Sequence, residues 1–291
     1  MMKEIRITNG YLEVKALVSE GPRVSHFGFA GEDSVLFGGP GAVVPEVEDV
    51  SISGQFGRGD YHFHWAHRLW AAPETIDSYY PDTDPVEVRN LGTNEVIDTD
   101  EVSDLGNLGI KLTSAPLAND LVYEIELSFD HADPSKLNVN HRIINMSDRQ
   151  LEVAPLGVTQ LAPGGVLTVP QGSTDPDKLL PDRVVVLWPY TNMGDDRVVW
   201  GEHEITIAQK NKEKFKIGTF NREGWASYRN NGSVFSKTWV VRTGARYPDS
   251  GCNFEAYTDA NILEMETLGE LSCLLPGECA EHLEVWRLER A

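Results

Sequence analysis

The spacing of turn residues is the feature that most constrains how this chain can fold. Short runs of alternating or β-branched residues recur along its length, for example residues 12–17 and 121–129. Turn pairs such as Asn9-Gly10 and Asn231-Gly232 separate these runs. No longer window keeps a helical apolar period without Pro or Gly inside it. Many short strands with frequent turns are typical of an all-β sandwich or barrel, built here as antiparallel sheets.

The same pattern predicts further strands and two loops. The other predicted strands are residues 34–37, 137–144, 184–188, 233–241, 262–268 and 282–288. Proline-containing stretches over residues 74–84 and 170–181 are interpreted as loops. The sequence shows no composition break, linker or internal repeat, so we expect one domain over residues 1–291.

Charge and hydropathy narrow the classes of partner. The chain carries 45 acidic and 25 basic residues, a formal net charge of −20. Such a balance repels phosphate backbones and anionic lipid surfaces, so neither nucleic acid nor membrane is an expected partner. No apolar run is long enough for a membrane span or a signal peptide. We expect a cytoplasmic protein, monomeric or homodimeric.

One segment, YHFHWAHRLWAAPE at residues 61–74, combines many aromatic and titratable groups. It holds His62, His64, Trp65, His67, Arg68, Trp70 and Glu74. Proteins that bind sugars need both kinds, because rings cover the C–H faces of a sugar while fixed polar groups read its hydroxyls. The segment predicts a carbohydrate partner.

A second constellation follows from strand parity near the C-terminus. Alternate residues of a strand share a face, so Glu264 and Glu266 point the same way. If the strand at 253–257 pairs with this one through a hairpin, Glu255 joins them. Clustered carboxylates raise one another's pKa and suit general acid–base chemistry. The alternative is a solvated outer face without function.

The sequence HRLWAAPE at residues 67–74 resembles the GGHRLWxAPE signature of a bacterial family without a settled reaction. Further similar segments are NHRIINMSD, QLAPGG, LWPYT, KIGT, YPDSGCNFEAYT, LEMETLGEL and LPGE…HLEVW, in the family's order. That family is similar to aldose 1-epimerases. The resemblance implies a large antiparallel β-sandwich of the galactose mutarotase-like type.

The resemblance also implies roles for particular residues. Arg68 matches the arginine that grips the sugar, and Glu266 matches the C-terminal general base, with Glu264 as the alternative on the same face. His67 is the candidate general acid. The chain departs from the mutarotases at residues 154–161, which contain no histidine, so His64 or His141 would be the other sources of an acid.

The remaining candidate binding residues surround these groups. Trp65 or Trp70 would stack on the sugar, and Glu255 and Tyr190 would contact it. Three of the candidates have a structural alternative: His67 and Trp70 could belong to the core, and Arg68 could pair with a buried carboxylate.

The expected function is aldose 1-epimerase-like acid–base chemistry on a sugar or sugar derivative, without a cofactor. One alternative is a carbohydrate-binding protein without catalysis. Another is a metal-assisted sugar isomerase or lyase, since His62 and His64 have a spacing that can chelate a metal on a strand. We expect no metal.

Overall fold

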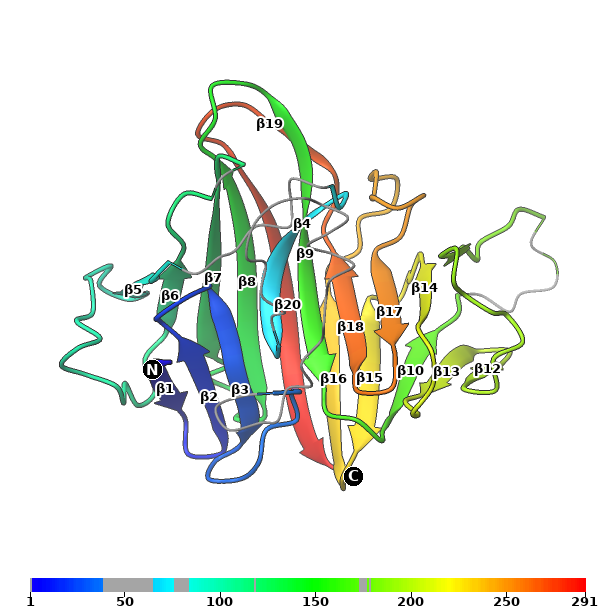
Figure 1. The fold of residues 1–291 in the computed structure, drawn as a ribbon, viewed down its shortest axis with the longest axis horizontal. Coiled ribbons are helices and arrows are strands. Elements are labelled where there is room, and N and C mark those ends of the chain that lie inside the picture. The colour runs from blue at the N-terminus through cyan, green and yellow to red at the C-terminus, as the bar shows by residue number, and fades with distance from the viewer. Residues whose placement is uncertain (1, 39–64, 76–83, 118, 173–176, 178) are drawn as a thin grey trace.

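The computed structural model describes residues 2–38, 65–75, 84–117, 119–172, 177 and 179–291. These residues form two large sheets of antiparallel strands and no helix, which confirms the predicted all-β sandwich (Figure 1). No helix in the described part of the chain could cross a membrane.

The first sheet has the strand order β1-β2-β3-β4-β9-β18-β17-β14-β11, with β19 also paired to β9. Its strands are β1 (Glu4–Thr8), β2 (Leu12–Leu17), β3 (Arg23–Phe29), β4 (His67–Ala72), β9 (Leu151–Leu161), β11 (Val185–Leu187), β14 (Phe215–Thr219), β17 (Phe254–Thr258), β18 (Leu263–Leu268) and β19 (Ser272–Leu274).

The second sheet has the order β12-β13-β10-β15-β16-β20-β8-β7-β6-β5. Its strands are β5 (Glu87–Asn90), β6 (Ile110–Thr113), β7 (Leu121–Phe129), β8 (Lys136–Asn145), β10 (Val166–Pro170), β12 (Val198–Trp200), β13 (Glu204–Ala208), β15 (Trp225–Asn230), β16 (Ser233–Trp239) and β20 (Cys279–Arg290).

The inner faces of the two sheets form the main core. Phe27 of the first sheet meets Phe235 and Trp286 of the second edge to face, with ring centroids 5.7 and 5.3 Å apart. All three rings are buried. Large aromatic side chains contribute much of the apolar area that folding removes from water, so this contact holds the two sheets together.

Most predicted strands are present, but residues 34–37 do not form one. Leu36 makes only an isolated bridge to Leu161, and Gly38 follows with a φ of 87°. The hydroxyl of Ser34 contacts the backbone of Phe27, which ties this stretch to the end of β3 as a turn.

Candidate functional site

Three glutamates lie on the outer face of the first sheet, the face turned away from the second sheet. β17 and β18 pair as a hairpin in which Glu255 stands opposite Glu266 and Tyr257 opposite Glu264. Between the two glutamates of β18, Met265 points inward and is fully buried in the core. The shared face predicted for Glu255, Glu264 and Glu266 is therefore present.

The ammonium group of Lys216 joins two of these carboxylates. Lys216 lies on β14, which pairs with β17. Its Nζ is 2.7 Å from Glu255 Oε2 and 2.9 Å from Glu266 Oε2, and it lies 4.7 Å from the ring centroid of Trp188. All three charged side chains are buried, so solvent screens these contacts weakly.

Burial and mutual repulsion keep protons on part of this cluster. Burial, with the charge of Glu266, raises the pKa of Glu255 to about 8 and that of Glu264 to about 7. Burial also raises the pKa of Glu266, although the adjacent Lys216 opposes the shift. Burial would lower the pKa of Lys216, but Glu266 and Glu255 hold it well above its ordinary value. Near neutral pH the cluster therefore holds carboxylic acid and carboxylate side by side.

The neighbouring strands add polar groups to the same face. On β9, Gln160 donates from Nε2 to Glu264 Oε1 at 2.8 Å. On β4, Arg68 is in register with Val158, which is itself in register with Glu266. Arg68 thus lies two strands from Glu266 in one row across the sheet, roughly 10 Å away at the usual strand spacing. Figure 1 shows β4, β9 and β18 side by side.

The candidate aromatic residues fall in three different places. Trp70 is buried in a small cluster with Leu156. The guanidinium carbon of Arg68 lies 4.6 Å from the centroid of the Trp70 ring. Trp65 is half-buried and packs against the main core. Tyr190 is 44% exposed, and burial together with nearby carboxylate charges raises its pKa to about 12. Of the three, Tyr190 is the one at the solvent side of the carboxylate cluster.

His67 does not lie with the carboxylates. His67 and Arg68 are neighbours on β4 and therefore point to opposite faces, so the His67 ring points between the sheets. It is fully buried there, and its ring centroid is 4.6 Å from that of Trp286. The structure therefore does not bring His67 together with Glu266, and its position agrees with the alternative that this histidine belongs to the core. His62 and His64 lie outside the described residues.

The hydrogen-bonding pattern determines which ring nitrogen of His67 carries the proton. Nδ1 of His141 is 3.0 Å from the carbonyl oxygen of His282, so this nitrogen must donate. His141 Nε2 then accepts from His67 Nε2 at 2.8 Å, and His67 Nδ1 accepts from the hydroxyl of Thr159 at 2.8 Å. Burial lowers the pKa of both histidines, which keeps them neutral. The His67 ring is thus fully engaged inside the sandwich.

A buried ion pair continues this polar network. Lys237 Nζ lies 3.1 Å from Glu284 Oε1, 3.2 Å from the carbonyl oxygen of Gly157 and 3.3 Å from that of Met265. Burial opposes both charges, but the ammonium group of Lys237 holds the pKa of Glu284 far below its ordinary value. Burial lowers the pKa of Lys237 as well. We assign Lys237 as an ammonium ion because three oxygen acceptors surround it. It ties β16 to β9 and β18, the strands that position the site.

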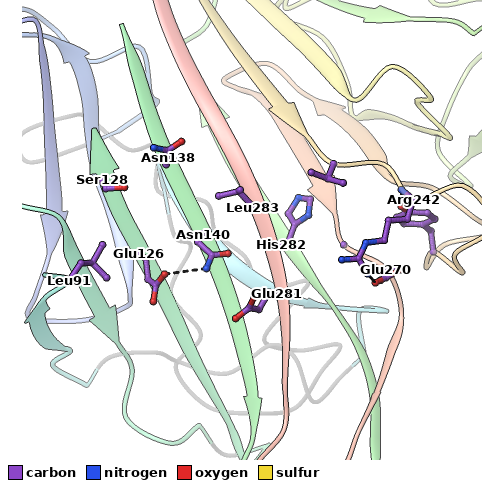
Figure 2. Close-up of a pocket in the computed structure, with 13 residues that line it drawn as sticks. Leu91, Glu126, Ser128, Asn138, Asn140, Arg242, Glu270, Glu281, His282 and Leu283 are labelled. Atoms are coloured by element: carbon purple, nitrogen blue, oxygen red, sulfur yellow. Dashed lines mark hydrogen bonds and ion pairs between the residues drawn. The ribbon is translucent and has the colours of Figure 1, made fainter. Parts of the chain in front are cut away.

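A separate pocket of about 510 Å³ opens on the second sheet. Figure 2 shows its lining, in which Asn140 donates to Glu126 at 3.1 Å, while the charged pair Arg242 and Glu270 lies at one side. This pocket lacks the convergent buried carboxylates of the first sheet, so the outer-face cluster is the stronger candidate for acid–base chemistry. Within the described residues, no group of three or more His, Cys, Asp or Glu side chains has metal-binding geometry.

The fold resembles that of known galactose mutarotase-like proteins. A structure from Synechocystis sp. PCC 6803 aligns with a TM-score of 0.61 and 10% identity over 100% of this chain and 97% of that one. An Escherichia coli K12 protein, provisionally described as an aldose 1-epimerase, aligns with a TM-score of 0.61 and 10% identity over 100% of both chains. A galactose mutarotase-like protein from Lactobacillus casei aligns at 0.55 and 9% identity over 98% and 100%.

At such low sequence identity, these similarities support the fold class alone. Neither a scan against protein-family models nor a search of curated proteins finds a match for this sequence. The chain is a β-sandwich of the galactose mutarotase-like class, and the carboxylate cluster on its first sheet is its candidate active site.

Proposed function

We propose that this protein interconverts the anomers of a sugar by acid–base catalysis at the outer-face carboxylates. The observation that carries the proposal is that Glu255, Glu264 and Glu266 share one face of the β17–β18 hairpin, with Lys216 in contact with Glu255 and Glu266. The aldose 1-epimerase-like fold of its structural neighbours and the similarity of the HRLWAAPE segment support a sugar as the substrate.

Anomer exchange requires one base and one acid. The base takes the proton of the anomeric hydroxyl, the acid gives a proton to the ring oxygen, and the bond between that oxygen and C1 breaks. The open-chain aldehyde turns about its C1–C2 bond and closes by the reverse proton transfers. On closure the acid recovers its proton from the ring-forming hydroxyl, and the base returns its proton to the anomeric oxygen. The enzyme regains its starting state, so the cycle needs no cofactor and no covalent intermediate.

Glu266 is the proposed base. Its carboxylate contacts Lys216, and the charge of buried Lys237 acts on it from inside the sandwich. Both ammonium groups favour its ionised form.

Glu264 is the proposed acid, in place of the histidine of the mutarotases. It shares the outer face with Glu266 two residues away, is half-buried and so remains reachable, and carries a pKa of about 7. Gln160 holds its orientation through one amide donor. Arg68, in the same row as Glu266, is placed to bind sugar hydroxyls.

The test is NMR exchange spectroscopy of the α and β anomers of a panel of aldoses. We expect wild-type protein to accelerate exchange for at least one sugar, and Glu266→Gln and Glu264→Gln to lose about 10²- to 10⁴-fold of that rate. Glu204→Gln, on the exposed face of β13, is the matched control and should retain the wild-type rate. Full activity in both site variants would refute the proposal. Saturable binding without exchange would indicate a carbohydrate-binding protein instead.

A further inference from the structure

The outer-face cluster has more acidic than basic groups. Among the described residues, the acidic side chains whose charges act on the cluster are Glu74, Asp249, Glu255, Glu264 and Glu266. The cationic side chains acting on the same groups from the outer face are Lys216 and Arg68. Lys237 contributes from the core side and is already bound to Glu284. Within the described part of the chain, the acidic groups acting on the cluster therefore outnumber the cationic ones.

Two carboxylate oxygens in the cluster have no donor among the described residues. Lys216 occupies Oε2 of both Glu255 and Glu266, while Oε1 of each is buried without a hydrogen-bond partner. Glu255 and Glu266 are each 2% exposed, so bulk water does not compensate. A buried acceptor without a donor has lost its hydrogen bonds to water without replacement, and a bound ligand that donates to it removes that cost.

The carboxyl of Asp249 adds to this demand for a donor. Burial raises the pKa of Asp249, and its charge raises the pKa of Glu255. Neighbouring carboxyls disfavour each other's ionisation, unless a cation lies against them. Aromatic rings stand nearby, with Trp188 packed on Lys216 and Tyr190 at the solvent side. Carboxylates together with aromatic rings are the surroundings in which proteins hold ammonium groups.

We propose that the sugar bound at this site carries an ammonium group, so that the preferred ligand is an amino sugar. This proposal rests on the proposed function for the position of the site. The ammonium group would donate to Oε1 of Glu255, which Lys216 leaves free, and Oε1 of Glu266 would remain to accept the anomeric proton. A phosphorylated or carboxylated sugar would meet net repulsion from the same groups.

The experiment is calorimetric binding to the full chain of matched sugar sets. Each set holds an amino sugar, its hydroxyl counterpart, its N-acetyl derivative and the 6-phosphate of the hydroxyl sugar. The gluco set is glucosamine, glucose, N-acetylglucosamine and glucose 6-phosphate, and the galacto and manno sets are built in the same way. The N-acetyl derivative keeps the nitrogen but removes its charge, so it separates charge from shape. We expect one amine to bind at least about tenfold more tightly than its hydroxyl and N-acetyl counterparts.

Variants locate the preference. Glu255→Gln keeps the size of the side chain but removes the carboxyl group that a bound ammonium would ionise, and we expect it to reduce the amine preference several-fold. Glu204→Gln should leave the preference unchanged. An equal preference in Glu255→Gln and wild type, an equal affinity for amine and hydroxyl sugars, or no binding of any amine would each overturn the proposal.

Binding and exchange also separate this inference from the proposed function. Amine-selective binding without anomer exchange would refute the function and leave the ligand class standing. Anomer exchange that favours neutral or anionic sugars would support the function and refute the ligand class.

Discussion

Replacing Gly157 with alanine tests whether the buried ion pair locks the strands that carry the site. Gly157 lies on β9, and the carboxylate of Glu284 packs directly over its Cα. A Cβ at this position would stand 2.4 Å from Glu284 Oε1, whereas ordinary contact begins at 3.4 Å. The oxygen would have to retreat by about 1 Å in a close-packed interior.

Moving Glu284 Oε1 destabilises the protein because this oxygen already accepts two buried hydrogen bonds. Glu284 Oε1 accepts from Lys237 at 3.1 Å and from the hydroxyl of Thr267. A shift of about 1 Å breaks the ion pair, and breaking a buried pair costs about 3–5 kcal/mol. Alanine in a strand normally gains about 0.5–1 kcal/mol over glycine. We therefore expect a net loss of at least about 2 kcal/mol, the opposite sign to an ordinary strand substitution.

The assay is urea unfolding of wild type, Gly157→Ala and a control, Gly194→Ala. Gly194 is exposed in a turn, and the nearest atom to its added Cβ is Asn192 Oδ1 at 3.4 Å. The control should lie within about 0.5 kcal/mol of wild type, as surface substitutions usually do. A Gly157→Ala variant as stable as the control would refute the reasoning that Glu284 is held in place.

Three other predictions follow from the site and the core. His67→Asn should lose about 1–3 kcal/mol of unfolding free energy in urea, because it leaves buried polar groups unpaired. Its anomer exchange rate should stay within several-fold of wild type. A loss of exchange activity without a loss of stability would instead indicate that His67 takes part in catalysis. Lys216→Met should raise the pKa of Glu266 further, moving the acidic limb of the exchange-rate profile to higher pH, and an unmoved limb would contradict the assigned contact. Glu264 binds its proton more tightly in the folded than in the unfolded protein, because folding raises its pKa to about 7. The resulting stabilisation is fully present at pH values below the unfolded pKa and is lost as pH rises through 7. Relative to Glu264→Gln, wild type should therefore gain stability in urea as pH falls from about 8 to about 5, and a difference that does not vary with pH would contradict the shift.

Strand parity was sufficient to predict the carboxylate face. Glu255, Glu264 and Glu266 share one face because the hairpin between β17 and β18 is local and its turn is visible in the sequence. The same rule could have corrected His67. Neighbouring residues on a strand face opposite ways, so Arg68 and His67 could not both meet the same sugar.

Other parts of the site depended on contacts that parity does not reveal. Lys216 reaches Glu266 through pairing of β14 with β17, strands that are distant in sequence. On β20, alternation alone would favour Leu283 as an inward residue, but it is 45% exposed while Glu284 is fully buried. Glu284 can be buried because Lys237 on the neighbouring β16 supplies its partner, a pairing that the linear sequence does not display.

The proposed chemistry requires the outer-face cluster to keep a carboxylic acid beside a carboxylate at neutral pH. A direct measurement is ¹³C NMR titration of the glutamate side-chain carboxyls in wild type, Glu255→Gln and Glu264→Gln. We expect two signals in wild type with midpoints near 7 and 8, and the loss of one of them in each variant. Glutamate signals that all titrate below about pH 5.5 would contradict the proposed acid–base pair, since the cluster would then hold no proton to donate.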